Sequence, residues 1–198
     1  QFFESAQLDV PIIWVPNLRR FIAYASAALN HFPTEAIQVI AVTGTNGKTS
    51  TTNFVYQLLK HLQKKVTLVG TNGIYYNDIA LNTKCSKLTT ITAIEFQSLV
   101  KEALNYGYDA VIIEASSHGL AEHRLDYSTI DIGVFLNLSE DHIEWHGSKE
   151  KYKNAKLRLA ELSKRLIVNN DDSFCKAVGL MTKKNVTTFS KQPTAQVF

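Results

Sequence analysis

The chain of 198 residues carries a formal net charge of +3, with 45% hydrophobic and 20% charged residues. These proportions are typical of a globular domain and exclude a disordered, fibrous or low-complexity chain. A chain of this length buries about 70% of its unfolded surface, which is enough for an ordinary core. The basic residues are scattered pairs, so no basic stripe indicates nucleic acid, and a groove for phosphorylated small molecules fits equally well.

Redox and targeting features are few. Cys85 and Cys175 lie far apart without metal-type spacing, which argues against a disulfide framework or a zinc site. No apolar run approaches the ~20 residues of a membrane span, and the first residues lack the pattern of a signal peptide. We therefore expect a cytoplasmic protein without membrane insertion. Since the chain begins at Gln1 and its only methionine is Met181, we expect it to be a piece of a longer protein.

The first sixty residues predict two units in which a strand precedes a helix. Residues 10–15 form a short apolar run typical of a strand. Pro16-Asn17 then opens a helix whose apolar positions recur at helical spacing, namely Leu18, Phe21, Ile22, Ala25 and Leu29. After a linker at 31–34 come a strand at 37–42, a glycine-bearing loop and a helix at 48–62.

The remaining elements continue the alternation of strand and helix. Residues 66–69 resemble a buried strand, and a hairpin is predicted around Asn77-Asp78. Thr92 and Glu95 form a capping box for a helix that Gly107 ends. Further apolar runs, each typical of a strand buried on both faces, lie at 110–113, 132–136 and 166–168. The expected fold class is α/β, with a mostly parallel sheet flanked by helices.

A phosphate-binding loop is the strongest motif. Residues 39–50 read VIAVTGTNGKTS, a strand that runs into a glycine-bearing turn and then a helix. The glycines leave backbone N–H groups unobstructed, and the helix N-terminus adds partial positive charge. Lys48 would reach the terminal phosphates and Thr49 would place its hydroxyl on Mg²⁺. The predicted ATP-binding residues are Gly44, Thr45, Asn46, Gly47, Lys48, Thr49 and Ser50.

The loop is a variant, because Val42 stands where the general pattern has its first glycine. The alternative interpretation is a glycine turn with a solvated lysine. The order of strand, loop and helix disfavours that alternative.

Two residues at strand ends are candidates for a metal site. Glu114 ends the buried strand at 110–113, and the carboxyl ends of parallel strands line the ligand crevice. His142 follows the strand at 132–136, so its imidazole could approach the same edge. A hydrogen-bonded structural role is the alternative for His142. Spacing alone does not choose between it and three other histidines, His118, His123 and His146.

Lys156 occupies an unusual position. Ser148 is a good N-cap for a helix at 149–162 with an apolar stripe of Tyr152, Ala155, Leu159 and Leu162. Lys156 lies at the edge of that stripe. From spacing alone the favoured interpretation is a stem that snorkels to solvent.

Together these segments resemble the Mur ligases. The motifs are GTNGKTS from Gly44, IEASSHGLAEHR from Ile113 and NLSEDHIEWHGSKEKYKNAK from Asn137. Within the family, the match is to the members that add the third amino acid of the peptidoglycan precursor. The resemblance implies the end of a UDP-binding domain with a linker at 1–33. It implies all or part of a P-loop NTPase-like central domain at 34–198, without the domain that selects the amino acid.

The resemblance implies an ATP-dependent ligase. ATP phosphorylates the terminal carboxylate of a UDP-muramoyl-dipeptide, and the amine of an amino acid attacks the acyl phosphate. Thr49, Glu114 and His142 are implied to bind Mg²⁺. Lys156 stands in the family's Tyr-x-x-Ala-Lys pattern, which implies that it is carbamylated and holds metal as the carbamate. Lys48, His142 and Lys156 are the implied catalytic residues.

The resemblance also implies a substrate site. Its residues are Thr89 and Thr90, which match a substrate loop, and Ser116 and Arg124, which hold the muramoyl-dipeptide. Two positions depart from the family pattern. Ile91 replaces a proline, which is expected to loosen the loop. Glu122 replaces a glutamine, and a glutamate is mildly repulsive to an anionic substrate.

Other interpretations stay open at this point. A second ligase of the superfamily, such as folylpolyglutamate synthase, is one, and a truncated module that binds nucleotide without catalysis is another. A regulatory GTPase is disfavoured because the sequence has no Asn-Lys-x-Asp guanine motif. The expected partners are UDP-muramoyl-dipeptide and an amino acid, without nucleic acid. The protein is expected to be monomeric, and this piece alone is expected to be inactive as a ligase.

Overall fold

The structure is a computed structural model that describes residues 12–81, 88–139, 141 and 143–192. Its strands are β1 (Gln38–Thr43), β2 (Val66–Gly70), β3 (Gly73–Tyr76), β4 (Ile79–Ala80), β5 (Ala110–Glu114), β6 (Ile130–Phe135), β7 (Ser163–Asn169) and β8 (Asn185–Phe189). Its α-helices are α1 (Leu18–Leu29), α2 (Lys48–His61), α3 (Ala93–Asn105), α4 (Ser117–Ala121), α5 (Ile143–His146), α6 (Lys149–Leu162) and α7 (Ser173–Met181). A short 3-10 helix, η1 (Pro33–Glu35), follows α1.

All eight strands form one sheet in the order β4-β3-β2-β5-β1-β6-β7-β8. From β2 to β8 every neighbouring pair is parallel, whereas β3 pairs antiparallel with both β2 and β4. The chain passes from β1 outward to β2, back to β5 and then across β1 to β6. Strand order therefore reverses around β1, which is where open parallel sheets place their ligands.

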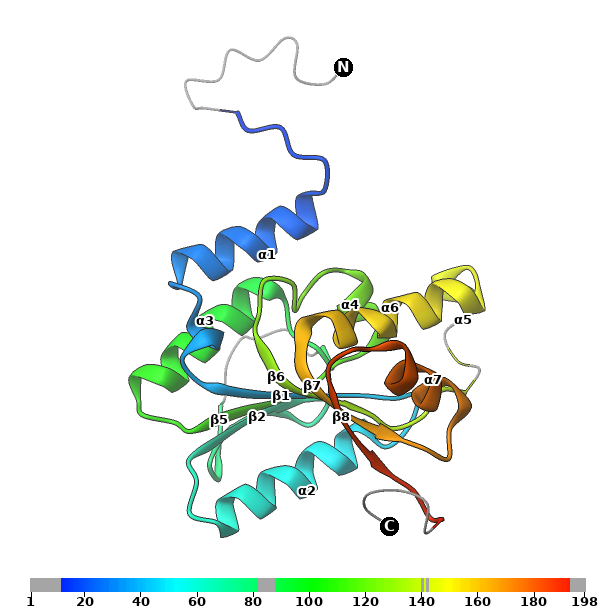
Figure 1. The fold of residues 1–198 in the computed structure, drawn as a ribbon. Coiled ribbons are helices and arrows are strands. Elements are labelled where there is room, and N and C mark those ends of the chain that lie inside the picture. The colour runs from blue at the N-terminus through cyan, green and yellow to red at the C-terminus, as the bar shows by residue number, and fades with distance from the viewer. Residues whose placement is uncertain (1–11, 82–87, 140, 142, 193–198) are drawn as a thin grey trace.

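Helices cover both faces of the sheet (Figure 1). On one face, Tyr56 of α2 packs with Ile40, Leu68 and Ile112. On the other face, side chains of α3, α4, α6 and α7 pack against the opposite sides of the same strands. All residues of β2 and β5 are buried, as the continuous apolar runs predicted. The expected α/β architecture with a mostly parallel sheet is confirmed.

Local capping signals explain where several helices begin. Asn17 accepts a hydrogen bond from the Arg20 backbone N–H at 3.0 Å and so caps α1. Thr92 and Glu95 form the predicted capping box of α3. Gly107, at φ 69°, follows the end of α3 in the left-handed conformation that glycine tolerates.

The prediction of a strand at 10–15 is wrong for the described residues 12–15. Residues 12–15 form no strand, and Ile13 and Trp14 are 70% and 79% exposed. An apolar run becomes a strand only beside a partner strand, and the nearby element is α1, a helix that packs against α3. Residues 10 and 11 lie outside the described part of the chain. Among the described residues no helix is long and apolar enough to cross a membrane.

Candidate nucleotide and substrate site

The glycine-bearing loop joins the end of β1 to the start of α2. Gly47 has φ 85°, and it precedes α2 without any side chain capping the helix. A Cβ at Gly44 would lie 3.0 Å from both the Leu136 Cβ and the Asn46 carbonyl oxygen. Both positions therefore require glycine. The first turn of α2 carries no acidic residue, so its N–H groups and dipole favour an anion.

Side chains from the loop after β6 hold the phosphate loop in place. The Asn137 side chain accepts from the Asn46 N–H at 2.9 Å and donates to the Asn46 carbonyl at 3.1 Å. The Thr45 hydroxyl accepts from the Ser139 N–H at 2.9 Å and lies 2.9 Å from the Tyr152 hydroxyl. Asn137 was not predicted as a site residue, because its contacts with the phosphate loop form only once β6 lies beside β1.

Lys48 lies over the loop that precedes it. Its Nζ donates to the carbonyl oxygens of Gly44 at 2.9 Å and Thr45 at 3.0 Å. Burial lowers the pKa of Lys48, and the negative charges of Glu114 and Asp141 oppose that shift. The loop therefore carries a preplaced cation beside its backbone N–H groups. Ser50, the last predicted nucleotide residue, is exposed on α2.

Glu114 is a buried carboxylate at the end of β5, with 1% exposure. It accepts from the Thr49 hydroxyl at 3.0 Å, from the Thr71 N–H at 2.9 Å and from the Thr71 hydroxyl at 3.2 Å. A Cβ at Gly70 would lie 2.1 Å from Glu114 Oε1, so glycine at the end of β2 makes room for the carboxylate. The structure thus brings Thr49 and Glu114 together, and adds Gly70 and Thr71, which sequence reasoning missed.

Lys156 is buried in the interior, with 2% exposure, and its amine does not snorkel to solvent. Its Nζ lies 3.5 Å from the Thr43 hydroxyl and 5.0 Å from the centre of the Tyr152 ring. Burial, and then repulsion from Lys48, lower the pKa of Lys156 to about 7. The interpretation from spacing alone is therefore wrong, because α6 lies against the sheet with this position facing inward.

Thr90 and Ser116 form a tight hydrogen-bonded unit beside Glu114. The Thr90 hydroxyl donates to the Glu114 carbonyl at 2.7 Å and accepts from the Ser116 N–H at 2.9 Å. Ser116 caps α4 through the Gly119 N–H at 3.0 Å. Thr89 lies on the other side, with its hydroxyl 3.1 Å from the Thr71 hydroxyl. The predicted substrate loop is therefore adjacent to the predicted metal ligands.

Arg124 points back to this loop. It donates to the Thr90 carbonyl at 2.6 Å and to the Glu122 carboxylate through Nε at 3.1 Å. The pKa of Glu122 is lowered, chiefly by the hydrogen bond from Arg124. Ile91 is 2% exposed within the main core, so its side chain anchors the loop rather than loosening it.

One cleft joins these groups. It has a volume of about 380 Å³ and is lined by Lys48, Leu88, Thr89, Ser116, His118, Glu122, Arg124 and Trp145. The phosphate-loop lysine and three of the four predicted substrate residues therefore share one cleft. One wall of the cleft is aromatic, with the ring centroids of His118 and Trp145 4.0 Å apart. This wall was not predicted.

His142, one of the predicted metal ligands, lies outside the described residues. Within the described part of the chain, no group of three or more His, Cys, Asp or Glu residues is placed to hold a metal ion. Thr49 and Glu114 still fit Mg²⁺, because this ion takes few protein oxygens and completes its shell with phosphate and water.

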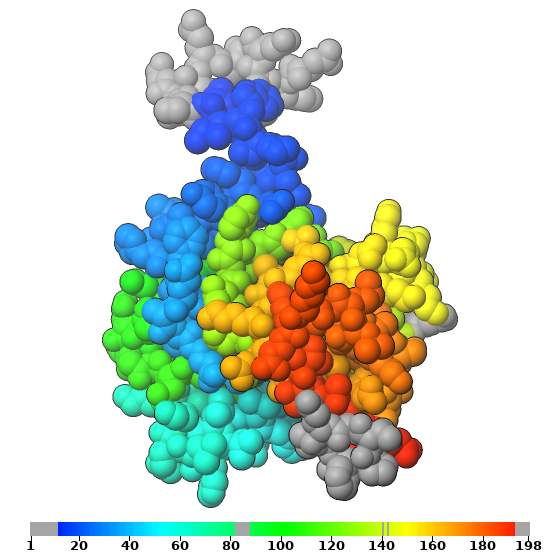
Figure 2. Space-filling view, in the orientation of Figure 1, coloured from blue at the N-terminus to red at the C-terminus, as the bar shows by residue number. Residues whose placement is uncertain are grey.

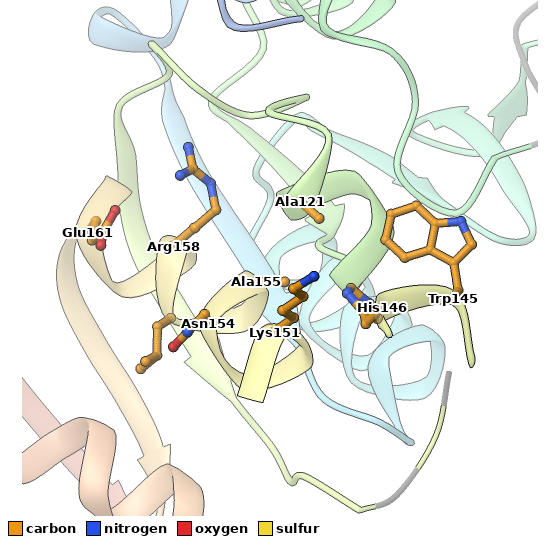
Figure 3. A pocket seen from close by; sticks show the side chains of 9 residues that line it. Ala121, Trp145, His146, Lys151, Asn154, Ala155, Arg158 and Glu161 are labelled. Carbon is orange, nitrogen blue, oxygen red and sulfur yellow. The ribbon is translucent and has the colours of Figure 1, made fainter. Parts of the chain in front are cut away.

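A larger hollow of about 500 Å³ lies on the other side of Trp145, between α4, α5 and α6. Figure 3 shows Lys151, Asn154, Arg158 and Glu161 along α6, with Lys151 directed toward His146. None of the predicted site residues lines this hollow. The predicted site residues instead line the smaller cleft at the carboxyl ends of β1 and β5.

The fold and the loop are typical of α/β domains that bind nucleoside triphosphates. Residues 42–198 match the family model described as the Mur ligase middle domain. The chain therefore belongs to the Mur ligase family.

Two curated relatives illustrate the similarity. The UDP-N-acetylmuramoyl-L-alanyl-D-glutamate–2,6-diaminopimelate ligase of Geobacillus thermodenitrificans is 34% identical over 96% of this chain. The corresponding L-lysine ligase of Staphylococcus aureus is 33% identical over 98% of this chain. In each case the chain spans only 40% of the relative's length.

Solved structures agree on the fold. A structure of a UDP-N-acetylmuramoyl-L-alanyl-D-glutamate–2,6-diaminopimelate ligase matches with a TM-score of 0.79 and 30% identity, covering 96% of this chain and 40% of that one. Escherichia coli FolC in complex with DHPP and ADP matches with a TM-score of 0.65 and 18% identity, covering 92% of this chain and 49% of that one. At that identity the second match speaks for the fold alone.

Proposed function

We propose that this chain is the ATP-binding part of a ligase in peptidoglycan biosynthesis. The whole protein adds the third amino acid to UDP-N-acetylmuramoyl-L-alanyl-D-glutamate through an acyl phosphate. The observation that carries the proposal is the single cleft that contains Lys48 of the phosphate loop together with Thr89, Ser116 and Arg124. A cytoplasmic location is part of the proposal and rests on the sequence having only two cysteines, far apart.

Each residue has a task in this reaction. ATP, when bound, supplies the phosphoryl group that activates the substrate carboxylate. Lys48 and the N–H groups of α2 neutralise phosphate charge, while Thr49 and Glu114 hold Mg²⁺. Arg124 and Ser116 hold the anionic dipeptide in the cleft. Such positioning supplies much of the rate in a phosphoryl transfer, because the reacting oxygens must lie in line.

Lys156 acts as a carbamate in this proposal, with His142 as a further metal ligand. A neutral amine adds to carbon dioxide, forming an N–C bond and releasing one proton, and the lysine becomes an anion with oxygen donors. The lowered pKa of Lys156, about 7, favours the neutral amine that this addition requires. Its burial beside Lys48 favours an anion over a second cation.

The test uses the full-length protein with ATP, Mg²⁺ and UDP-N-acetylmuramoyl-L-alanyl-D-glutamate. The amino acids to compare are 2,6-diaminopimelate and L-lysine, which the names of the relatives contain. We expect ADP to form only when the muramoyl-dipeptide and one of these amino acids are both present. No ADP with either amino acid would contradict the proposal.

Three alternatives predict different outcomes. A folylpolyglutamate synthase would form ADP with a folate and glutamate and would not respond to the muramoyl-dipeptide. A non-catalytic module would bind ATP without any turnover in the full-length protein. A GTPase would bind GTP in preference to ATP in a competition assay, which we do not expect.

A further inference from the structure

Helix α1 is held against residues 122–127 by two separate ionic contacts. Arg19 Nη2 lies 3.1 Å from Glu122 Oε1, and Arg20 Nε lies 3.8 Å from Asp126 Oδ2. In the space-filling view, the blue helix lies against the yellow-green segment that contains these carboxylates (Figure 2). Two neighbouring arginines of one helix thus reach two different carboxylates.

Other contacts hold α1 independently of Arg19. The Asn17 side chain lies 3.2 Å from His123 Nε2, and the rings of Tyr24 and Tyr127 pack edge to face at 5.2 Å. The helix also packs against α3. We therefore expect α1 to stay docked when the Arg19 charge is removed.

Glu122 divides its carboxylate between two arginines. Oε1 faces Arg19, whereas Oε2 accepts from Nε and Nη2 of Arg124. The side chains of Glu122 and Arg124 are only 21% and 16% exposed, so their charges are weakly screened. Both residues line the cleft, whereas Arg19 does not.

Arg124 keeps donors for a further acceptor. A guanidinium has five N–H groups. Among the described residues, the bonds to Glu122 and to the Thr90 carbonyl use three of them, which leaves one on each terminal nitrogen.

We propose that Arg19, Glu122 and Arg124 form a charge relay through which helix α1 sets the affinity of the cleft for an anionic substrate. The relay rests on the proposed function, which places the muramoyl-dipeptide in this cleft. With Arg19 in contact, the three charges sum to +1, and Arg124 attracts an anion. Without Arg19, Glu122 and Arg124 neutralise each other. Arg19 is therefore a positioning residue that acts through Glu122.

The test compares KM and kcat for UDP-N-acetylmuramoyl-L-alanyl-D-glutamate in full-length protein variants. Arg19→Gln is expected to raise KM by about two- to fivefold at low ionic strength, the range of a largely exposed ion pair, with kcat nearly unchanged. Arg19→Lys should restore KM. Added salt should shrink the difference, because the Arg19 end of the relay is exposed.

Two further variants separate the relay from a structural effect. Arg20→Gln is the matched control, because Asp126 keeps its ion pair with Arg158 at 2.5 Å, so its KM should stay unchanged. In a Glu122→Gln background, adding Arg19→Gln should have no further effect on KM. Equal KM values for the Arg19 and Arg20 variants, or an Arg19 effect that persists without the Glu122 charge, would overturn the relay alone. No turnover by the unaltered protein would overturn the proposed function and the relay with it.

Discussion

The position of the Glu114 carboxylate depends on Gly70, which has no functional group of its own. Gly70 ends β2, and any Cβ there would overlap Glu114 Oε1. Gly70→Ala should therefore push the carboxylate away from Thr49 and Thr71. A hydrogen bond to a charged group is worth about 1.5–3 kcal/mol, so we expect the Mg²⁺-dependent part of ATP binding to weaken about tenfold or more. Calorimetric titration with and without Mg²⁺ measures this.

A second strand glycine provides the control for that titration. Gly133 lies within β6, and a Cβ there would approach the Ser163 hydroxyl to 2.3 Å. Gly133→Ala should lower stability without changing the Mg²⁺ dependence of ATP binding. Equal Mg²⁺ dependence in the two variants would refute the role given to Gly70.

The burial of Lys156 predicts a pH effect on stability in carbon dioxide-free buffer. The pKa falls from 10.5 in the unfolded chain to about 7 in the folded chain. Between these values the unfolded state binds more protons, so the free energy of unfolding rises with pH. The Lys156 contribution rises by at most about 1.4 kcal/mol per pH unit above pH 7. Urea unfolding of wild type and Lys156→Met at pH 7, 8 and 9 isolates the Lys156 contribution. If the free energies of unfolding of the two proteins changed equally with pH, a buried amine would be contradicted.

Some site residues could be predicted from sequence and others could not. The phosphate loop is a local motif, because strand, turn and helix are consecutive in the chain. Asn137, Gly70 and Thr71 meet that site only through strand pairing, so no local pattern marks them. His142, the remaining predicted ligand, lies outside the described residues and stays a prediction.

At the scale of elements, the carbonyl oxygens at the end of α6 accept hydrogen bonds from Lys184, which precedes β8. Lys184 Nζ donates to the carbonyl oxygens of Ala160 at 2.7 Å, Glu161 at 2.8 Å and Ser163 at 2.5 Å. These carbonyls carry the negative end of the helix dipole and lack partners within the helix. Lys184→Met should lower the free energy of unfolding by about 1–2 kcal/mol, measured by urea denaturation.

The adjacent lysine is the comparison for this substitution. Lys183 is exposed, so Lys183→Met removes the same charge without touching α6. We expect its unfolding midpoint to match that of the wild type. If both variants lose the same stability, the carbonyl contacts of Lys184 are not responsible.

Elements with strong local signals were predicted well, and those without were not. The capping box at Thr92 and the turn at Asn77 define α3 and the β3–β4 hairpin from neighbouring residues alone. The strand β8 was not predicted, because it is only half-buried and lacks an apolar run. The helix α7, which precedes it, was not predicted either. The strand expected at 10–15 failed for the opposite reason, since its apolar residues have no strand beside them.

At the scale of the whole molecule, alternation of strands and helices predicts a parallel sheet but not the order of its strands. That order, with β5 between β2 and β1, decides which strand ends meet. It places Glu114 beside the phosphate loop, since Glu114 is in register with Val42. The same order brings Thr89 and Ser116 to the cleft beside Lys48, and so joins a nucleotide residue to the substrate residues.

The central claim is that the substrate carboxylate receives a phosphoryl group before the amide bond forms. The direct measurement uses full-length protein and muramoyl-dipeptide labelled with oxygen-18 in its terminal carboxylate. When the amine displaces phosphate from an acyl phosphate, the bridging oxygen leaves with the phosphate. We therefore predict one oxygen-18 atom in each phosphate released, detected by mass spectrometry. Amide formation with unlabelled phosphate would contradict the account.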